Sequence, residues 1–277
     1  MEMRPVRIVV WSDVQYPYHD TETDRAFNRF LADFQPDFAV LNGDGLDFPT
    51  ISRFDRNPVN PTSIRAEVEG FKAYLREKSR ILGPNCHKHF NEGNHEDRLR
   101  KYLWRQAPAL SDLGGLSLQS LLDLGDWSYT PYYDPMNVAN GSPDASPGID
   151  ISGLLVIHGW EARKWSGMTA RECYNQFGGS GITGHTHRLA AFYHTKFDGG
   201  GDDGIRELAT YVWLEGGCMC SLTPPYAPAP DWQQGFVAGY LLPDGGASVR
   251  FDIRQVPIIH NKFMWNGQLY TPQSRGR

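Results

Sequence analysis

The chain lacks a long hydrophobic run, since no stretch of its 277 residues approaches the roughly 18 consecutive apolar residues of a membrane-spanning helix. Its first apolar run ends at Trp11, before Ser12 and Asp13, and is too short for the apolar segment of a signal peptide. We therefore expect a cytosolic protein with no membrane partner.

Cysteine is scarce, and the four residues present, Cys86, Cys173, Cys218 and Cys220, form neither a zinc-binding spacing nor a disulfide framework. Reduced thiols are the simple interpretation. Cys218 and Cys220 flank one methionine and could bind a soft metal, although packing is the commoner role for such a pair.

An excess of positive charge is missing too, and the net charge of -5 gives no overall attraction to DNA or RNA. Apolar residues make up 40% of the chain, which is enough for one sizeable core, and no linker or internal repeat divides it. We expect a single α/β domain over residues 1–277, with a loop-rich insertion at about 107–150 and a disordered tail at about 272–277.

Strands and helices alternate in the N-terminal part of the chain. A β-branched run predicts a strand at Val6–Trp11. A helix is predicted from Thr21, where Asp24 completes a capping-box-like pattern, to the residue before Pro36. The pattern then predicts a strand at 37–41, a helix from about 62 to 83, a strand around 88–90 and a basic helix at Asp97–Gln106.

The remaining chain is less regular at first. A short helical pair at 113–124 precedes a long surface loop at 131–148. Strands are predicted at 153–158 and 180–184, on either side of a helix at 169–177. Four later strands, near 190–196, 206–214, 236–242 and 248–255, suggest a second, more antiparallel sheet. The proline-rich segment 221–232 cannot be regular, and it and loop 131–148 are expected to select the substrate.

Five polar clusters stand at the ends of predicted strands, where open α/β sheets bind ligands. They are Asp13-Val14-Gln15, the segment from Asn42 to Asp47, Gly93-Asn94-His95-Glu96, His158-Gly159 and Gly184-His185-Thr186-His187. Carboxylate, amide and imidazole groups together suit a divalent metal such as Mn, Fe, Zn, Ni or Mg. Taken singly, Asp13 is better explained as a cap and Asp44 as part of a tight turn. Taken together, the clusters offer ligands for two ions with one carboxylate between them.

In this order the clusters resemble the five motifs of the calcineurin-like metallophosphoesterase family, with Gln15 in place of the usual histidine. The resemblance runs from Asp13 to His187. Three further segments resemble the sequences of a bacteriophage-type subgroup: residues 16–20, Arg98-Leu99 and Trp232-Gln233-Gln234-Gly235. The family resemblance implies an α/β fold, a four-layer αββα sandwich with two central mixed β-sheets flanked by helices.

The same resemblance implies a role for each motif residue. The metal ligands would be Asp13, Gln15 and His187 for the first ion, Asn94, His158 and His185 for the second, and Asp44 as the bridge. His95 would protonate the leaving oxygen, and Asp47 would orient His95 unless it is a plain loop acid. Glu96 and Asp97 are expected to support the site or cap a helix. The implied reaction is hydrolysis of a phosphate ester by in-line attack of a hydroxide that bridges two metals.

Gln15 departs from the family pattern, and its neutral carbonyl oxygen is a harder and weaker ligand than imidazole. It favours Mn²⁺, with Mg²⁺, Fe, Zn²⁺ and Ni²⁺ as alternatives. A similar Asp-x-Gln motif occurs in the manganese-dependent ADP-ribose and CDP-alcohol phosphatases of the superfamily, which makes a nucleotide-type substrate the favoured one. His19 is an alternative source of the missing imidazole.

Three functions stay open at this point. The leading one is a phosphodiesterase or phosphatase acting on a small phosphoester or nucleotide, in the host cytoplasm if the gene belongs to a phage. A nuclease is the second, supported by the basic residues after His95, and a catalytically degenerate phosphate-binding protein is the third, suggested by Gln15. Arg98 and Arg188 are candidates for substrate binding. Four aromatic residues could stack on a base or simply pack: Trp160, Trp165, Tyr226 and Trp232.

Overall fold

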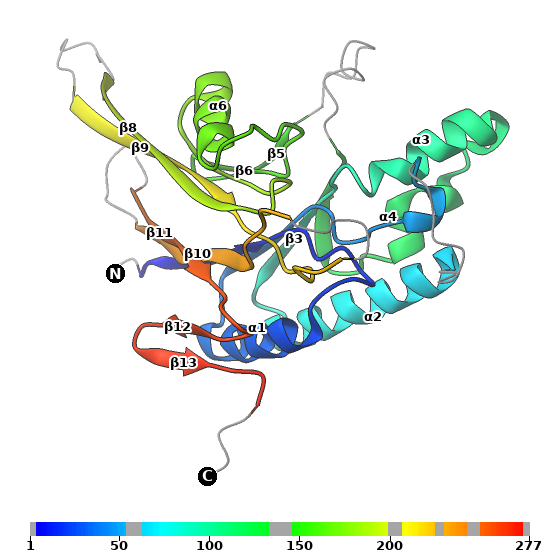
Figure 1. Cartoon of the computed structure of the whole chain (residues 1–277), viewed down its shortest axis with the longest axis horizontal. Coiled ribbons are helices and arrows are strands. Elements are labelled where there is room, and N and C mark those ends of the chain that lie inside the picture. Colours follow the sequence, from blue (N-terminus) through cyan, green and yellow to red (C-terminus); the bar gives the residue numbers. More distant parts are fainter. Residues whose placement is uncertain are drawn as a thin grey trace.

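Two mixed β-sheets lie face to face in the computed structural model, with α1 and α2 outside the larger sheet and α6 outside the smaller one (Figure 1). The structure describes residues 4–53, 63–132, 146–198, 207–224, 230–242 and 250–273. This arrangement confirms the predicted four-layer αββα sandwich. No helix in the described ranges is long and apolar enough to span a membrane.

The larger sheet has the strand order β11-β10-β1-β2-β3-β4, in which β1 to β4 run parallel. Its strands are β1 (Val6–Trp11), β2 (Phe38–Asn42), β3 (His87–Asn91), β4 (Trp127–Thr130), β10 (Gly235–Leu242) and β11 (Arg250–Pro257). The smaller sheet has the order β5-β6-β7-β9-β8. Its strands are β5 (Gly148–Ile151), β6 (Leu154–Ile157), β7 (Ser180–Thr183), β8 (Leu189–Asp198) and β9 (Glu207–Gly216).

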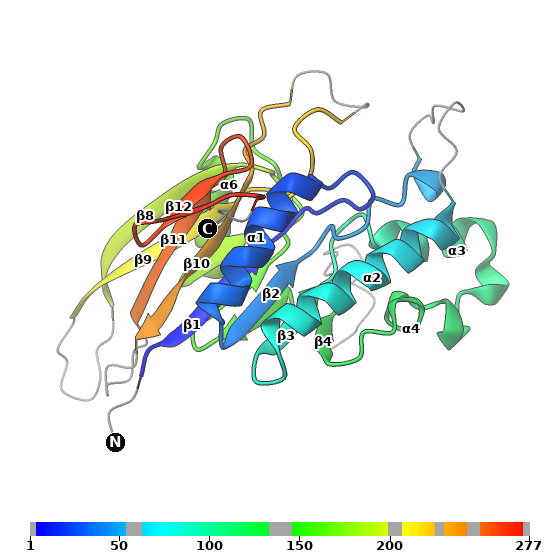
Figure 2. The ribbon, with the colours of Figure 1, turned by 90° about the horizontal axis from the view of Figure 1, so that it is seen from below.

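The helices are α1 (Thr21–Phe34), α2 (Ile64–Leu82), α3 (Asp97–Gln106), α4 (Leu118–Leu122) and α6 (Met168–Phe177), with 3-10 turns at Pro49–Ile51, Pro108–Leu110 and Gly114–Leu116. Figure 2 shows α1 and α2 lying across the outer face of the larger sheet. A hairpin of β12 (Phe263–Trp265) and β13 (Gln268–Tyr270) packs beside α1.

The alternation of side chains along β1 explains why the sheet is buried on both faces. Val9 and Trp11 pack in the core beneath α1 and α2, whereas Ile8 and Val10 pack in the core between the two sheets. Because successive strand residues point to opposite faces, a continuous apolar run fits a strand that is covered on both sides. The polar residues after each such strand are therefore free to serve the site at the sheet edge.

The helix at α1 begins at the predicted residue, but its cap differs from the prediction. Asp20 is the N-cap, and its side chain accepts hydrogen bonds from the backbone N–H groups of Glu22 and Thr23. Asp24, predicted to complete a capping box, instead pairs with the buried ammonium group of Lys78 on α2, at 2.6 Å. The capping-box interpretation was wrong because Asp20 has the extended backbone that an N-cap requires.

The four late strands do not form one sheet as predicted. Strands β8 and β9 join the smaller sheet, whereas β10 pairs antiparallel with β1 and carries β11 with it. Both faces of β10 are apolar, with Phe236 in the core beneath the helices and Val237 in the core between the sheets. Such a strand fits the open edge of β1, where its backbone groups find partners.

The predicted loops and tail lie partly outside the described ranges. For loop 131–148 only the two ends are described, and its last residue, Gly148, belongs to β5, so the predicted boundary was wrong. For segment 221–232, residues 225–229 lie outside the description. The tail was predicted from Pro272, but the carbonyl oxygen of Gln273 accepts a hydrogen bond from Arg29. Residues 274–277 lie outside the described ranges.

Candidate metal centre

The turns that follow β1, β2 and β3 lie side by side, because these strands are parallel neighbours in the larger sheet. They carry Asp13, Asp44 and Asn94. Strands β6 and β7, which are parallel neighbours in the smaller sheet, end at His158 and at the turn with His185. The amide of Asn42 joins the two sheets, donating a hydrogen bond of 2.6 Å to the carbonyl oxygen of Ile157.

The predicted ligands converge into two clusters. One contains Asp13, Asp44 and His187, and the other contains Asp44, His158 and His185. In each cluster one ligand atom per residue lies within 4.8 Å of the others. Asp44 belongs to both, which is the position expected of a bridging carboxylate.

The first cluster is built around the carboxylate of Asp13. Its Oδ2 accepts a hydrogen bond of 3.1 Å from the backbone N–H of His185. Its Oδ1 is buried and accepts no hydrogen bond from the described part of the chain, although Nε2 of His187 lies 3.0 Å away. Gln15 faces the same nitrogen, with its Nε2 at 3.2 Å from Nε2 of His187. A turn of that amide brings its oxygen to the same position.

The second cluster has a defined imidazole orientation. Nδ1 of His158 lies 2.8 Å from the carbonyl oxygen of Asn42, so this nitrogen carries a proton and donates it. Nε2 therefore faces inward, 3.3 Å from Oδ1 of Asp44 and 3.3 Å from Oδ1 of Asn94. A histidine whose outer nitrogen is bonded to a carbonyl is the usual arrangement of a metal ligand.

The backbone at this site adopts unusual conformations. Five predicted ligands have a positive φ, between 49° and 66°, which non-glycine residues rarely adopt: Asp13, Gln15, Asp44, His185 and His187. Gly93 fits only because it lacks a side chain, since a Cβ there would lie 2.2 Å from Oδ1 of Asp44. Such conformations persist where the surrounding structure fixes them, and they gather at functional sites.

Protons on two imidazoles offset the negative charge of the carboxylates at this site. Burial lowers the pKa of His158, but the negative charge of Asp44 outweighs burial and raises this pKa to about 9. Burial likewise lowers the pKa of His187, and the charge of Asp13 raises it to about 10. Burial and the charge of His158 lower the pKa of His185 to about 4, so its imidazole is neutral at pH 7.

The donor set fits divalent metal ions. Two buried carboxylates lie at the site, and the charge of Asp44 opposes the ionisation of Asp13. Divalent ions would replace the protons on the imidazoles and would supply the positive charge that both carboxylates need. Oxygen and nitrogen donors of this kind suit Mn, Fe, Zn, Ni and Mg ions.

His95 lies beside the shared carboxylate but is held by other residues. Its Nε2 lies 3.6 Å from Oδ2 of Asp44, and its Nδ1 lies 3.0 Å from Oδ1 of Asp47. Arg98 donates to Nε2 of His95 at 2.8 Å and to the carbonyl oxygen of Asp47 at 2.5 Å. Arg98, predicted to bind substrate, therefore contacts the two predicted catalytic residues.

Three glutamates hold the turns of the site. Glu96 accepts hydrogen bonds from the backbone N–H groups of Asp44, Leu46 and Gly93, as expected of a supporting residue. Glu67, on α2, accepts from the N–H groups of Asp47 and Phe48. Glu215, at the end of β9, accepts from the hydroxyl of Thr186 at 2.8 Å, within the turn that carries His185 and His187.

The sequence reasoning missed Glu67 and Glu215. Glu67 lies on the same helical face as Ile64 and Phe71, and a charged residue on an apolar face is a signal for a buried hydrogen-bonding role. Glu215 follows the apolar run of β9 directly. Neither position could be matched to its partner from sequence, because the partners lie far away in the chain.

Several residues considered for metal or substrate binding have other partners in the structure. Arg188 donates to the carbonyl oxygen of Arg163 at 2.7 Å, and its Nε lies 3.3 Å from Asp231. His19 stacks on the ring of Tyr16 and belongs to neither cluster around Asp44. In the basic helix α3, Arg100 pairs with Glu92 and Asp97, and Lys101 pairs with Asp97 at 2.7 Å. Asp97 thus pairs with basic residues of its own helix.

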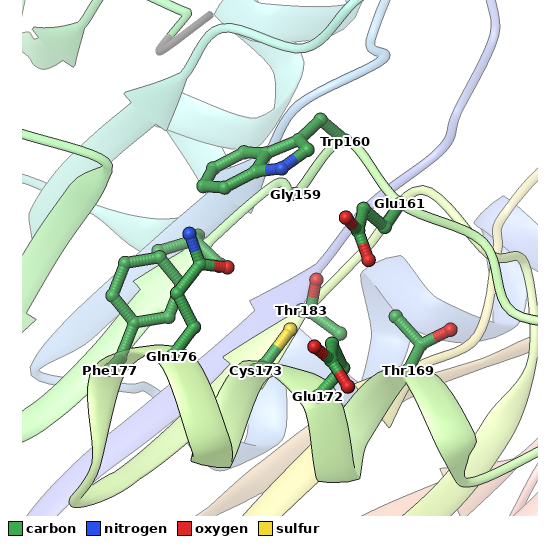
Figure 3. Close-up of a pocket in the computed structure, with 10 residues that line it drawn as sticks. Gly159, Trp160, Glu161, Thr169, Glu172, Cys173, Gln176, Phe177 and Thr183 are labelled. Carbon is green, nitrogen blue, oxygen red and sulfur yellow. The ribbon is translucent and has the colours of Figure 1, made fainter. Parts of the chain in front are cut away.

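The four aromatic residues considered for stacking on a base lie in different surroundings. The ring of Trp232 lies 4.2 Å from that of His187. Trp160 covers a small pocket beside α6, together with Phe177 and Cys173 (Figure 3). The volume of this pocket, ≈ 10 Å³, is only about what one water molecule requires, so the pocket holds no nucleotide. Trp165 is exposed, and Tyr226 lies outside the described ranges.

Comparison with known proteins shows that the chain is similar to two phage proteins. It is 30% identical over 272 residues to the gene 54 protein of Mycobacterium phage D29, which covers 95% of this chain and 98% of that protein. It is also 30% identical over 271 residues to the gene 54 protein of Mycobacterium phage L5, again over 95% and 98% of the two chains. No family model matches the sequence.

Among solved structures, Vps29 complexed with zinc from Entamoeba histolytica is similar at a TM-score of 0.43 and 13% identity, over 97% of this chain and 100% of that one. At that score the likeness carries no argument about this chain. The two phage relatives confirm the bacteriophage-type resemblance. The chain belongs to the family of the mycobacteriophage gene 54 proteins.

Proposed function

We propose that the chain is a phosphoesterase that uses two divalent ions, preferably Mn²⁺, to hydrolyse a phosphodiester or phosphomonoester of the nucleotide type. One observation carries the proposal. Asp44 belongs to both ligand clusters, and its Oδ2 lies 3.6 Å from Nε2 of His95. A protein that only stored metal or bound phosphate would not need an imidazole beside the shared carboxylate.

The candidate site residues have separate roles in metal binding and proton transfer in this proposal. Asp13, Gln15 and His187 would hold one ion, Asn94, His158 and His185 the other, and Asp44 would contact both. When bound, the ions supply a water that is acidic enough to react near neutral pH, and they neutralise the phosphoryl oxygens. His95 supplies a proton to the leaving oxygen from Nε2, and Asp47 fixes the ring through Nδ1.

Arg98 connects acid and substrate in this proposal. Its guanidinium occupies Nε2 of His95 in the free protein, at 2.8 Å. Nε2 accepts a hydrogen bond from Arg98 and so carries no proton in the free protein. A phosphate group entering the site would attract the guanidinium away, and Nε2 would then take up a proton from solvent, which it gives to the leaving oxygen. Arg98 would then contact His95 before substrate binds and the phosphate group afterwards.

The proposal also specifies Mn²⁺ as the preferred metal and a small molecule as the substrate. The carbonyl oxygen of Gln15 is a neutral, hard ligand, which favours Mn²⁺ or Mg²⁺ over Zn²⁺. The net charge of -5 disfavours long nucleic acid, and the ion pairs of Arg100 and Lys101 neutralise much of α3, on which the nuclease alternative depended. By analogy with the phage relatives, the enzyme would act in the host cytoplasm.

Hydrolysis by the full-length, metal-stripped protein tests the proposal. We expect added Mn²⁺ to support turnover of bis-p-nitrophenyl phosphate or p-nitrophenyl phosphate, with Mg²⁺, Zn²⁺ and Ni²⁺ tested in parallel. His95→Ala should lower kcat by roughly 10²–10⁴-fold while the Mn²⁺ content is kept. Asn94→Ala should lower the Mn²⁺ content itself.

His260→Ala serves as the control, because this imidazole is exposed and belongs to neither cluster. Absence of turnover with all four ions would leave a phosphate-binding protein as the better description. Cleavage of circular or linear single-stranded DNA at a rate above that of the small esters would favour a nuclease.

A further inference from the structure

A third cluster of metal-ligand atoms lies on the outer side of His187. Cys218, Cys220 and His187 each offer one atom, and the three atoms lie within 4.8 Å of one another. Sγ of Cys220 lies 3.8 Å from Nδ1 of His187. The other ring nitrogen, Nε2, lies 3.0 Å from Oδ1 of Asp13. The two nitrogens of one imidazole thus face two different clusters, one with sulfur donors and one with oxygen donors.

The backbone holds the two cysteines against the first motif. Residues 218 and 220 each form an isolated β-bridge, to Gln234 and His19 respectively. Between them, the backbone N–H of Met219 lies 3.2 Å from the carbonyl oxygens of both Ser12 and Asp13. Because the neighbouring backbone is fixed, the sulfur atoms are positioned before any ligand arrives.

The separation of the donor atoms suits a tetrahedral ion. With bonds of about 2.3 Å to sulfur and about 2.0–2.1 Å to nitrogen, a sulfur and a nitrogen ligand of such an ion stand about 3.5–3.6 Å apart. The observed 3.8 Å between Sγ of Cys220 and Nδ1 of His187 exceeds this separation by only about 0.2 Å, which a small side-chain rotation closes. Both cysteines are free thiols and almost fully buried, so they face no competing solvent.

We propose that Cys218, Cys220 and Nδ1 of His187 form a separate site for a thiophilic metal ion, Zn²⁺ or Cu(I). Thiolate donors prefer these ions to Mn²⁺ or Mg²⁺. On binding, each thiol releases its proton to solvent and a metal–sulfur bond forms. This site goes beyond the proposed phosphoesterase function, since it needs no hydrolysis.

The shared imidazole couples the two sites. A neutral imidazole has one nitrogen lone pair, so His187 serves one ion at a time unless it loses both protons. An ion bound to the sulfur atoms therefore withdraws His187 from Asp13 and Gln15. A thiophilic ion would weaken binding of the hard ion at the first cluster and would act as an inhibitor.

Direct metal binding to the reduced, metal-stripped, full-length protein tests the site, with Cd²⁺ as a spectroscopic probe of thiolate ligation. We expect one equivalent of Cd²⁺ to bind with a thiolate-to-metal absorption band. Cys218→Ser and Cys220→Ser should each weaken binding by about a hundredfold or more and reduce the band, and the double variant should lose it. Met219→Leu is the control within the segment, and Cys86→Ser with Cys173→Ser controls for the other thiols. A band that survives loss of both Cys218 and Cys220, or no band in the parent protein, would overturn the proposal.

A second measurement tests the coupling. In protein first loaded with Mn²⁺, formation of the thiolate band should be accompanied by release of Mn²⁺. Release without the band in the Cys218→Ser/Cys220→Ser variant would mark simple displacement at the oxygen cluster. A band in the parent with Mn²⁺ affinity unchanged would overturn the sharing of His187. None of these readouts depends on turnover, so failure of the hydrolysis assay and failure of this proposal are distinguishable.

Discussion

Nη2 of Arg98 lies 2.8 Å from Nε2 of His95, so the imidazole proposed as the acid accepts a hydrogen bond from a permanent cation. The same guanidinium donates to the carbonyl oxygen of Asp47 at 2.5 Å. Arg98 thereby ties the imidazole to the loop that carries its partner carboxylate. This contact makes Arg98 a positioning residue as well as a candidate for binding phosphate.

Replacement of Arg98 separates these two roles. Arg98→Met keeps the apolar stem but removes both hydrogen bonds, and we expect kcat to fall between about tenfold and a hundredfold because the ring of His95 is no longer oriented. Arg98→Lys should recover part of the loss. Steady-state kinetics with Mn²⁺ measure the effect, and Arg105→Met, on the exposed end of the same helix, is the control. A raised KM with an unchanged kcat would assign Arg98 to uniform substrate binding alone.

Gly93→Ala tests how tightly the bridging carboxylate is confined. A Cβ at this position would lie 2.2 Å from Oδ1 and 2.4 Å from the backbone nitrogen of Asp44, so one of the two turns must move. We expect loss of Mn²⁺ binding and a fall in the free energy of unfolding of about 1–3 kcal/mol. Isothermal titration and urea unfolding measure the two effects.

Gly115→Ala is the matched control for this substitution, because a Cβ there meets no atom within 4 Å. If Gly93→Ala binds Mn²⁺ as the parent does, then Asp44 is not held where metal binding requires it.

The convergence of the candidate ligands was predictable from sequence because each stands within four residues of the end of a strand. A buried strand such as β1 has a recognisable β-branched run, and Asp13 stands just beyond its end. Parallel strands bring such residues together whatever their distance along the chain. The basic helix α3 was likewise predicted with its observed limits, since His95-Glu96 precedes it and Ala107-Pro108 ends it.

The contacts between segments that are distant in sequence were not predictable in this way. The apolar run of β10 fits either sheet, and only the open edge of β1 decides between them. The carboxylate of Glu67 bonds to N–H groups 19 and 20 residues away, which no local pattern encodes. The β12–β13 hairpin is different, since Asn266-Gly267 between two short apolar segments is a recognisable turn signal that was overlooked.

Glu67 predicts a pH dependence of stability. Burial raises the pKa of its carboxyl to about 8, and its Oε2 has no hydrogen-bond partner among the described residues. The folded protein therefore keeps a proton that the unfolded chain releases above its ordinary pKa of about 4.3. This group's contribution to stability is fully present at lower pH and is lost as the pH rises towards about 8.

Glu67→Gln removes this titration while keeping an acceptor for the N–H groups of Asp47 and Phe48. We expect the variant to match the parent near pH 5 and to exceed it by about 1–3 kcal/mol at pH 9. Urea unfolding of both metal-free proteins at several pH values measures the difference. Glu69→Gln, on the exposed face of the same helix, should leave the pH profile unchanged. Parallel profiles for Glu67→Gln and the parent would mean that Glu67 is ionised when folded.

Gln15→His tests whether this position selects the metal. The side chain is buried, and its Nε2 lies 3.2 Å from Nε2 of His187, so an imidazole at position 15 would face the same cluster. Imidazole is a softer and stronger donor than an amide oxygen, and we expect Zn²⁺ affinity to rise about tenfold or more while Mn²⁺ affinity changes little. The ratio of Zn²⁺-supported to Mn²⁺-supported turnover should rise in parallel. Competition against a chromogenic chelator measures the affinities, with Gln106→His as the control for an added surface imidazole. Equal Zn²⁺ affinities for Gln15→His and the parent would exclude Gln15 from the metal ligands, because a ligand exchange of this kind must change the selectivity of the site.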